Sequence, residues 1–566
     1  MRRILPFLAI GAMAFTLSAQ YPGSLPPGPG YPNPGYPPAQ GYPPQGYPGP
    51  GANPNLPDDV PGQPVARIGV LNGDASIQHR DSGEWTAAVV NAPLTAGDAI
   101  SLPPGSRAEL QLDFGNFVRI DGDTELRFAA FDGAHAQIQL SRGSITWRAL
   151  RDSPLRVEIS TPVVAVHPER LSAVRVEAAA DGSTRVTVRR GEAEASTPRG
   201  TEHVREASTM LVHGAPDGNA EYQMVPAAPP DAWDSWNDQR DNFLSRAQSN
   251  RFVSPDIYGA EDLDAAGRWG YDPNYGNVWT PNVPPGWAPY SDGSWVWVDP
   301  YGWTWVDAMP WGWAPFHYGS WYFRVGFGWT WFPGSRLAHY WWHPAMVGFF
   351  GFGSNIGWVP LAPYERFHPW YGPGVTVGVG FGFGRTVGVV GSFRNAGFAT
   401  GLAVADFQRG AFANRFVVSR EQLAQSSIVR GPLPVAPTAA SRRFTSRPAA
   451  TAGPRASFSN QRFFSAPSAA MARPAAPAAA SGWQRFGQTP PGRMGGPAPQ
   501  AGGWDRFGSP GRTNGFEGSQ QPRSLQVAPP IMRQRQAAPP SYSRPSGGGG
   551  NRGGGGGRPS GSGGHR

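Results

Sequence analysis

The amino-acid sequence predicts a mainly β protein, in which a β-sandwich or β-roll precedes a tryptophan-rich β-repeat module. Residues 66–213 alternate apolar and polar side chains over short stretches separated by Gly, Asp and Pro, as half-buried strands and their turns do. Between Trp269 and Trp331, tryptophans return every 26 residues, and such a period indicates one small unit that is copied and stacked. The 566 residues include 76 Gly and 63 Pro, so we expect much of the chain to lie outside any folded core.

The first 19 residues have the layout of a secretory signal peptide. The charged start Arg2-Arg3 precedes an apolar stretch that ends in the small residues Ser18 and Ala19, so we expect cleavage after Ala19 and export of the mature chain. No later segment offers the roughly 20 unbroken apolar residues of a transmembrane helix. The chain contains no cysteine, which excludes a disulfide framework and a lipid anchor on cysteine.

Residues 20–64 form a Tyr/Pro/Gly-rich segment. Tyr-Pro pairs recur there in a Gly, Pro and Gln background, which favours an extended, disordered spacer that cannot bury a core.

Residues 66–213 predict a compact all-β domain. The run Ala108–Leu112 alternates, and Ser183–Ala193 places Val186 and Val188 on one face with Arg185 on the other. About a dozen strands of this kind in some 150 residues favour a sandwich or roll.

This domain resembles the FecR-type domain of bacterial envelope proteins. The similar segments are Ile120–Leu126, Leu140–Ile145, Ile159–Val166 and Val188–Ala193. The resemblance implies a FecR-like β-domain in an envelope protein. In the regulators that name the family, a segment ahead of this domain crosses the membrane and acts on a sigma factor. Here a cleavable signal and a Pro-rich spacer occupy that place, so we do not expect direct sigma-factor regulation.

Residues 230–371 begin with an expected amphipathic helix at 230–249 and continue as the repeat module. Asp231 is placed to cap this helix, and one face carries apolar residues for packing: Trp233, Trp236, Phe243, Leu244 and Ala247.

Each 26-residue unit predicts a β-hairpin or small meander. Gly and Pro are too frequent for helix, whereas Trp, Tyr, Phe, Val and Thr favour strands. Trp295 and Trp297 share parity, as do Trp303 and Trp305, and the turn-forming run 299–302 separates the two pairs.

The repeat region resembles an uncharacterised family of tryptophan-rich bacterial envelope proteins, whose module often follows a FecR-like domain. The similar segments are Trp311–Trp321 and Ile356–Pro363. This resemblance implies no established activity.

Two further regions follow. Residues 372–429 form a Gly/Val-rich, β-prone extension, whose strand at 375–384 has one nearly bare glycine face and leaves self-association open. Residues 430–566 are rich in Arg, Gly, Pro and Ala and predict a disordered tail. One short word occurs twice in it, as Gly482–Gly487 and as Gly503–Gly508.

The sequence offers no convincing catalytic constellation, so we expect a protein that is not an enzyme and binds no cofactor. His339 and His343 have a spacing that suits a metal only on a helix, and Pro344 opposes one, so no metal site is assigned. Asp292, Asp299 and Asp307 stand close to tryptophans, as in carbohydrate sites, but favour a turn-forming role. An exported protein seldom meets nucleic acid, so we expect the Arg-rich tail to meet anionic envelope polymers instead.

The function of the tryptophans depends on which of them are exposed. Indoles that stack on sugars must be open to solvent, and the candidates for this ligand-binding role are Trp287, Trp295, Trp303, Trp313, Trp321 and Trp329. The candidates for a purely structural role are Trp269, Trp279, Trp305 and Trp331. The first hypothesis is an exported envelope scaffold or binding module that meets an envelope protein or an anionic or polysaccharide polymer. The alternatives are a carbohydrate-binding protein and a FecR-type signalling component.

The signal-like start predicts a shortened mature protein. Mass spectrometry of chain recovered from the envelope should find Gln20 or a close neighbour as the first residue, because the small residues before it suit signal peptidase. Recovery of envelope protein with an intact Met1 would contradict this expectation.

Overall fold

The computed structural model describes residues 64–214, 219–371, 390–450, 458, 461–465 and 482–486, and the mainly β fold is confirmed. Within these ranges no helix is long and apolar enough to span a membrane. The signal segment, the Tyr-Pro spacer, residues 372–389 and most of the Arg-rich tail lie outside the described residues.

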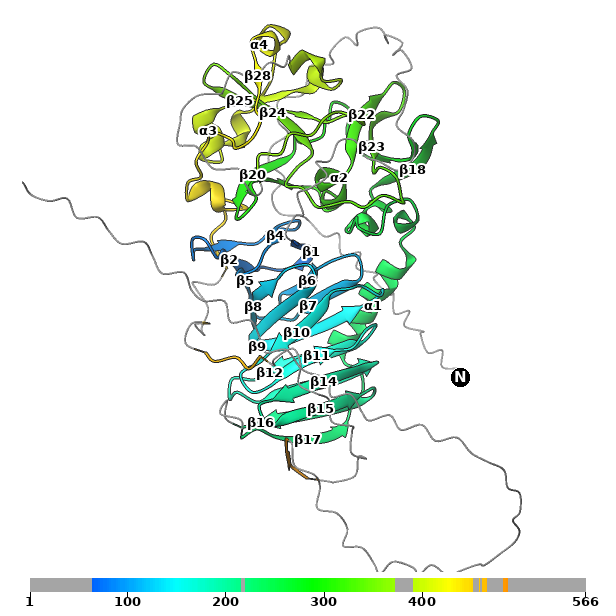
Figure 1. Cartoon of the computed structure of the whole chain (residues 1–566), viewed down its shortest axis with the longest axis vertical. Helices are drawn as coiled ribbons and strands as arrows, with labels where there is room; N and C mark the ends of the chain where they lie inside the picture. The colour runs from blue at the N-terminus through cyan, green and yellow to red at the C-terminus, as the bar shows by residue number, and fades with distance from the viewer. Residues whose placement is uncertain are drawn as a thin grey trace, which may run out of the picture. The chain divides into compact units, whose positions relative to one another are not determined.

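The first 17 strands belong to the β domain (Figure 1). They are β1 (Ala66–Asn72), β2 (Ser76–Gln78), β3 (Trp85–Ala87), β4 (Pro93–Leu94), β5 (Ala99–Leu102), β6 (Arg107–Gln111), β7 (Asn116–Ile120), β8 (Thr124–Phe131), β9 (His135–Ala149), β10 (Arg156–Ser160), β11 (Ala165–Pro168), β12 (Ala173–Ala178), β13 (Thr184–Arg190), β14 (Glu192–Thr197), β15 (Gly200–Arg205), β16 (Ser208–His213) and β17 (Glu221–Pro226).

Two sheets face each other across one aliphatic core. In the first sheet the strands follow the order β4-β1-β6-β7-β9-β12-β13-β16-β17. In the second the order is β3-β2-β5-β8-β9-β10-β11-β14-β15, antiparallel except for the parallel pair β9–β10. The long strand β9 belongs to both, so the domain is a sandwich whose sheets share a strand.

Glycine makes the passage from sheet to sheet sterically allowed. Gly143 divides β9 at φ +96°, and a Cβ there would lie 2.2 Å from the Thr124 hydroxyl oxygen. Gly73 and Gly191 occupy equivalent corners with positive φ. At each corner the next backbone N–H donates to a hydroxyl on a neighbouring segment: Asp74 to Ser106 (3.0 Å), Ser144 to Thr124 (3.0 Å) and Glu192 to Ser172 (3.1 Å). Glycine therefore sets three corners of the sandwich in the same way.

Helix α1 (Ala232–Arg246) covers the outer face of the first sheet. Asp231 caps it as expected, through a reciprocal capping box with Asp234. Trp233 is buried and donates from Nε1 to Thr146 Oγ1 at 2.9 Å. The expected apolar face is only partly correct, because Phe243 is 40% exposed beneath the Arg240 guanidinium, whereas Asp234 and Asn237 are buried.

Ion pairs join this helix to the sheet. Arg119 is fully buried and contacts Glu109 at 2.8 Å and Asp241 at 2.7 Å. Three further pairs flank it: Arg240–Glu109 (2.8 Å), Arg148–Asp241 (2.6 Å) and Arg189–Asp234 (2.6 Å). Burial alone would raise the pKa of Glu109, but the charges and hydrogen bonds of Arg119 and Arg240 hold it below its usual value.

Four hairpins form the repeat module. Their strands are β18 (Gly267–Asp272) with β19 (Gly276–Pro281), β20 (Gly293–Val298) with β21 (Gly302–Asp307), β22 (Ser320–Arg324) with β23 (Gly328–Phe332), and β24 (Val347–Phe352) with β25 (Asn355–Pro360). The hairpin prediction for each 26-residue unit is confirmed. The fourth hairpin was not predicted, because its unit departs from the 26-residue spacing and carries fewer tryptophans.

Short elements complete the module. They are η1 (Ser249–Arg251), η2 (Ala260–Leu263), α2 (Trp313–His317), η3 (Val390–Ser392), η4 (Ala396–Phe398), β26 (Thr400–Ala403), α3 (Val404–Gln408), η5 (Phe412–Asn414), β27 (Phe416–Val417), α4 (Arg420–Ala424), β28 (Ser427–Ile428) and η6 (Ala440–Arg442). β18, β19, β23 and β22 form one sheet, β20 and β21 a second, and β24 and β25 join β26, β27 and β28 in a third.

The tail starts later than residue 430. Leu433, Val435 and Phe444 are buried, and the Val435 carbonyl accepts the Trp303 indole N–H at 2.9 Å. The expected disorder is therefore wrong for residues 430–450. Leu433 and Val435 join the core of the repeat module, and Phe444 joins the core of the β domain.

Arg119 supplies the first stability prediction. We expect Arg119→Leu to lower the free energy of unfolding by about 3–5 kcal/mol, because it leaves the buried carboxylates without their shared partner. The matched control is Arg185→Leu, whose side chain is 57% exposed in its pair with Glu177 and should cost about 0–1 kcal/mol. Urea unfolding followed by circular dichroism measures both, and equal midpoints would refute the proposed role of the ion-pair network.

Candidate functional site

The repeated tryptophans form cross-strand pairs. Trp269 faces Trp279, Trp295 faces Trp305, Trp321 faces Trp331, and Phe349 faces Trp358 in the fourth hairpin. The 26-residue period therefore records at least one aromatic pair per hairpin, and the second and third hairpins add Trp297 opposite Trp303 and Phe323 opposite Trp329. The Trp295 and Trp305 rings meet edge to face, with 5.4 Å between ring centroids.

Five of the six candidate ligand-binding tryptophans are buried. Exposed fractions are 0% for Trp295, Trp313 and Trp321, 1% for Trp303 and 3% for Trp329. Trp287 is half-buried against Trp311, Phe316 and Trp321. The ligand-binding role offered for these five positions is thus corrected, because all five are buried in one aromatic cluster that the hairpins share with residues of the segment 390–450.

The four candidate structural tryptophans lie in the same cluster. Trp279, Trp305 and Trp331 are at most 1% exposed, whereas Trp269 is half-buried and stacks on Phe252. Most of the indole N–H groups are held by backbone or side-chain acceptors: Trp269 by Ser249 Oγ (2.8 Å), Trp279 by the Leu263 carbonyl (3.2 Å), Trp305 by Asp307 (3.0 Å), Trp321 by the Pro315 carbonyl (2.8 Å) and Trp331 by the Tyr318 carbonyl (2.9 Å).

Asp307 organises a turn inside the aromatic cluster. Its side chain accepts from the Trp305 indole and from the Met309 backbone N–H at 2.9 Å. Burial raises the pKa of Asp307 well above its ordinary value. Because its two carboxylate oxygens already accept bonds from the protein, the geometry fits the turn-forming interpretation.

The two histidines of the possible metal pair lie in different surroundings. His339 is exposed and contacts Asp256 at 3.1 Å, whereas His343 is buried and bonds to the Tyr371 hydroxyl. His317, also buried, bonds to the His343 carbonyl at 2.7 Å. Burial lowers the pKa of His317 and of His343 to about 3, so both rings are neutral at physiological pH.

A half-exposed aromatic patch, Tyr275-Tyr322-Phe332-Tyr364, lies on the first and third hairpins and the loop after β25. Ring centroids of Tyr275 are 4.7 Å from Tyr322, 5.4 Å from Phe332 and 6.0 Å from Tyr364. The Tyr322 hydroxyl donates to Asp272 at 2.9 Å, and burial together with this carboxylate raises the pKa of Tyr322. Sequence reasoning missed this patch because only tryptophan was followed through the repeat.

A groove of about 560 Å³ lies on the β domain. Its walls come from the corner at Gly143, the turn between β12 and β13, the end of β16, and Trp483 from the tail. Arg142, Glu177 and Arg185 give it charges of both signs. The groove and the aromatic patch are accessible surfaces of the described part of the chain that offer clustered recognition groups.

The paired tryptophans generate a second stability prediction. We expect Trp305→Ala or Trp331→Ala to lower the free energy of unfolding by about 3–5 kcal/mol, because each removes a buried indole and its hydrogen bond. Trp341→Ala is the control, since Trp341 is 48% exposed. Calorimetry compares the three, and melting of the core variants at the parent temperature would contradict the structural role.

Comparison with known proteins agrees with these two modules. Residues 98–194 match the family model described as FecR protein, and residues 260–365 match a family of unknown function, DUF6600. No curated protein matches the chain.

Two crystal structures, at 1.65 Å and 2.50 Å resolution, of a protein proposed to be an anti-sigma factor from Parabacteroides distasonis resemble part of the chain. Each has 20% identity and a TM-score of 0.20, and the match covers 23% of this chain and 59% of that one. The chain thus combines a FecR domain at 98–194 with a DUF6600 region at 260–365.

Proposed function

We propose that this protein is an exported, non-enzymatic component of the bacterial envelope, in which two β modules form a scaffold that presents binding surfaces to another envelope component. The observation that carries this proposal is the burial of the paired tryptophans. Trp279, Trp295, Trp305, Trp321 and Trp331 are each at most 1% exposed, so the repeat spends its aromatic surface on its own core.

Contacts between the two modules support a scaffold. Arg67 on β1 contacts Asp262 at 2.7 Å, and the Thr95 hydroxyl donates to the Asp299 carbonyl at 3.2 Å. The amide of Asn91 donates to the Met309 carbonyl at 2.8 Å. Strand β1 and the segments on either side of β4 thus hold the repeat module, an arrangement suited to one supporting body.

The buried titratable groups are bonded to other groups of the fold, which supports a non-enzymatic role. Glu109 pairs with two arginines, Asp307 accepts two N–H groups, and His317 bonds to a backbone carbonyl. A catalytic acid, base or nucleophile must instead reach a substrate. Each of these groups has its bonding directed into the fold.

The FecR domain supports placement in the envelope and a component of the signalling type, because FecR-like proteins are associated with the envelope and interact with other envelope proteins. The signal-like first 19 residues support export.

Carbohydrate binding is the second candidate, and the aromatic patch favours it. Four half-exposed rings, with Asp272 and Arg324 3.4 Å apart beside Tyr322, combine stacking faces with polar groups. A polysaccharide of the envelope would meet both kinds of group there.

Acrylamide quenching of tryptophan fluorescence, with and without peptidoglycan fragments, separates the two functions. The scaffold proposal predicts weak quenching that the glycan leaves unchanged, because the indoles are already covered. Retention of the parent chain on peptidoglycan sacculi is measured alongside Tyr322→Ala, with Tyr271→Ala as the exposed control. Strong retention that Tyr322→Ala abolishes without altering the melting temperature would replace the scaffold proposal with carbohydrate binding.

A further inference from the structure

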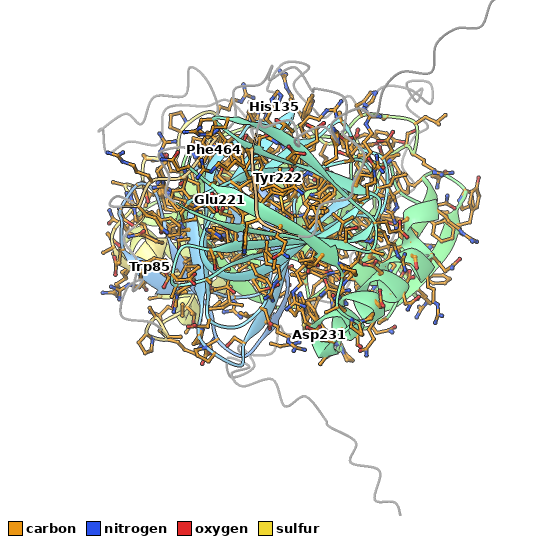
Figure 2. The ribbon with its side chains drawn as sticks, turned by 90° about the horizontal axis from the view of Figure 1, so that it is seen from below. Trp85, His135, Glu221, Tyr222, Asp231 and Phe464 are labelled. Carbon is orange, nitrogen blue, oxygen red and sulfur yellow. The ribbon has the colours of Figure 1, made fainter. Side chains whose placement is uncertain are left out.

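A short segment of the tail adds a strand to the β domain. β29 (Gln484–Arg485) pairs antiparallel with β17, opposing Gln484 to Tyr222 and Arg485 to Glu221. Figure 2 shows Glu221 and Tyr222 on the strand that closes this end of the sandwich. β17 is the last strand of its sheet contributed by the β domain, so β29 covers an edge that would otherwise present unpaired backbone groups.

The side chains of this segment make specific contacts. Phe486 is 1% exposed, lies 4.7 Å from the Tyr222 ring and belongs to the core of the β domain. Arg485 pairs with Glu221 at 2.9 Å, and the Tyr222 hydroxyl donates to Gln484 at 3.0 Å. Trp483 packs 3.9 Å from the His213 ring at the mouth of the groove. Backbone pairing and these four side-chain contacts together resemble the binding of a peptide by strand addition.

The same two-residue step, arginine followed by phenylalanine, contacts the β domain at a second place. Arg443 pairs with Glu84, and the neighbouring Phe444 is 6% exposed and lies 5.1 Å from the His79 ring. At both places a glutamate on the β domain receives the arginine while the following phenylalanine enters the core. This repetition indicates that the step is a recognition pattern.

The sequence holds a second copy of the longer word. Gly503–Gly508 repeats Gly482–Gly487, with Trp504, Arg506 and Phe507 at the positions of Trp483, Arg485 and Phe486. The two words differ only by Asp505 in place of Gln484. The second word begins 21 positions after the first begins (503 − 482 = 21), and one edge strand accepts one of them at a time.

We propose that the edge of β17 and the adjoining groove form an exchangeable docking site for the Gly-Trp-x-Arg-Phe-Gly word, and that Gly503–Gly508 is its second ligand. The bound copy is a preformed ligand at high effective concentration, because it is tethered to the same chain. Lengthening the tether by the distance between the words changes the closure cost only slightly, so the second copy competes with the first.

The one difference between the words predicts their ranking. The Tyr222 side chain is hydrogen-bonded to Glu202, and burial of Tyr222 together with the charge of this glutamate raises the pKa of the tyrosine hydroxyl. A carboxylate at the Gln484 position therefore meets a second carboxylate. Asp505 makes the second word the weaker ligand, and its replacement by asparagine should strengthen binding by roughly threefold to tenfold.

Amide hydrogen exchange of full-length variants tests whether one word can replace the other at the edge of β17. The word variants are Trp483→Ala with Phe486→Ala, Trp504→Ala with Phe507→Ala, and all four substitutions together. Each word variant alone should keep the β17 amides protected, because the other word takes the edge, whereas the fourfold variant should lose protection at least about tenfold. A first-word variant already as unprotected as the fourfold variant would overturn the proposal, as would full protection in the fourfold variant.

Peptide titration gives a second test that does not depend on the stability of those variants. A peptide of residues 500–511 should bind the fourfold variant once per chain, the Asp505→Asn peptide more tightly, and a peptide with Trp504→Ala and Phe507→Ala not at all. Glu221→Arg in the protein should weaken the parent peptide, and Arg506→Glu in the peptide should restore binding. Failure of the parent peptide to bind where a peptide of residues 479–490 does bind would overturn the proposal.

Discussion

The structure depends on the inability of a 26-residue hairpin to bury a core alone. A hairpin has two strands, so its aromatic side chains can be covered only by another element. Here each hairpin contributes at least one cross-strand aromatic pair, and the pairs converge on a shared cluster. Within it, ring centroids of Trp305, Trp358, Phe349 and Trp370 lie within 6.1 Å of that of Trp295. Tryptophan suits this role because it fills volume, and at Trp279, Trp305 and Trp331 its N–H also finds a buried acceptor. The same constraint explains why residues 390–450, far along the chain, are needed to close the cluster.

A different solution holds the first module together. The sandwich has an aliphatic core between its sheets, but the outer face of its first sheet carries charged residues that α1 must cover. The cost of burying Arg119 is offset by two carboxylates and by Asn237, whose carbonyl lies 2.9 Å from the guanidinium. Because these bonds are directional, they fix the position of α1 on the first sheet.

Much of this architecture could be predicted from the sequence, and the parts that could not share a physical cause. The hairpins followed from the spacing of Trp295 and Trp305, and the start of α1 from Asp231, because periodicity and capping are local. The exposure of a side chain is not a local property, because the same tryptophan spacing suits a buried pair or an open platform. At Trp303 the covering residue is Val435, which the composition had assigned to the tail and whose carbonyl accepts the Trp303 indole N–H. The fourth hairpin was not predicted because its aromatic pair, Phe349 and Trp358, departs from the 26-residue spacing and contains phenylalanine in place of one tryptophan. The burial of the polar residues Asp234 and Asn237 on α1 was not predicted, because the periodicity used to identify the helix considers apolar residues alone.

The central claim is that the repeat uses its tryptophans as a core. Nuclear magnetic resonance of the full chain with ¹⁵N-labelled tryptophan reports hydrogen exchange at each indole N–H. The account predicts that Trp279, Trp305, Trp321 and Trp331, whose N–H groups are bonded inside the cluster, exchange only when the module unfolds, while the half-exposed Trp483 exchanges at once. Immediate exchange at those four indoles under native conditions would contradict it.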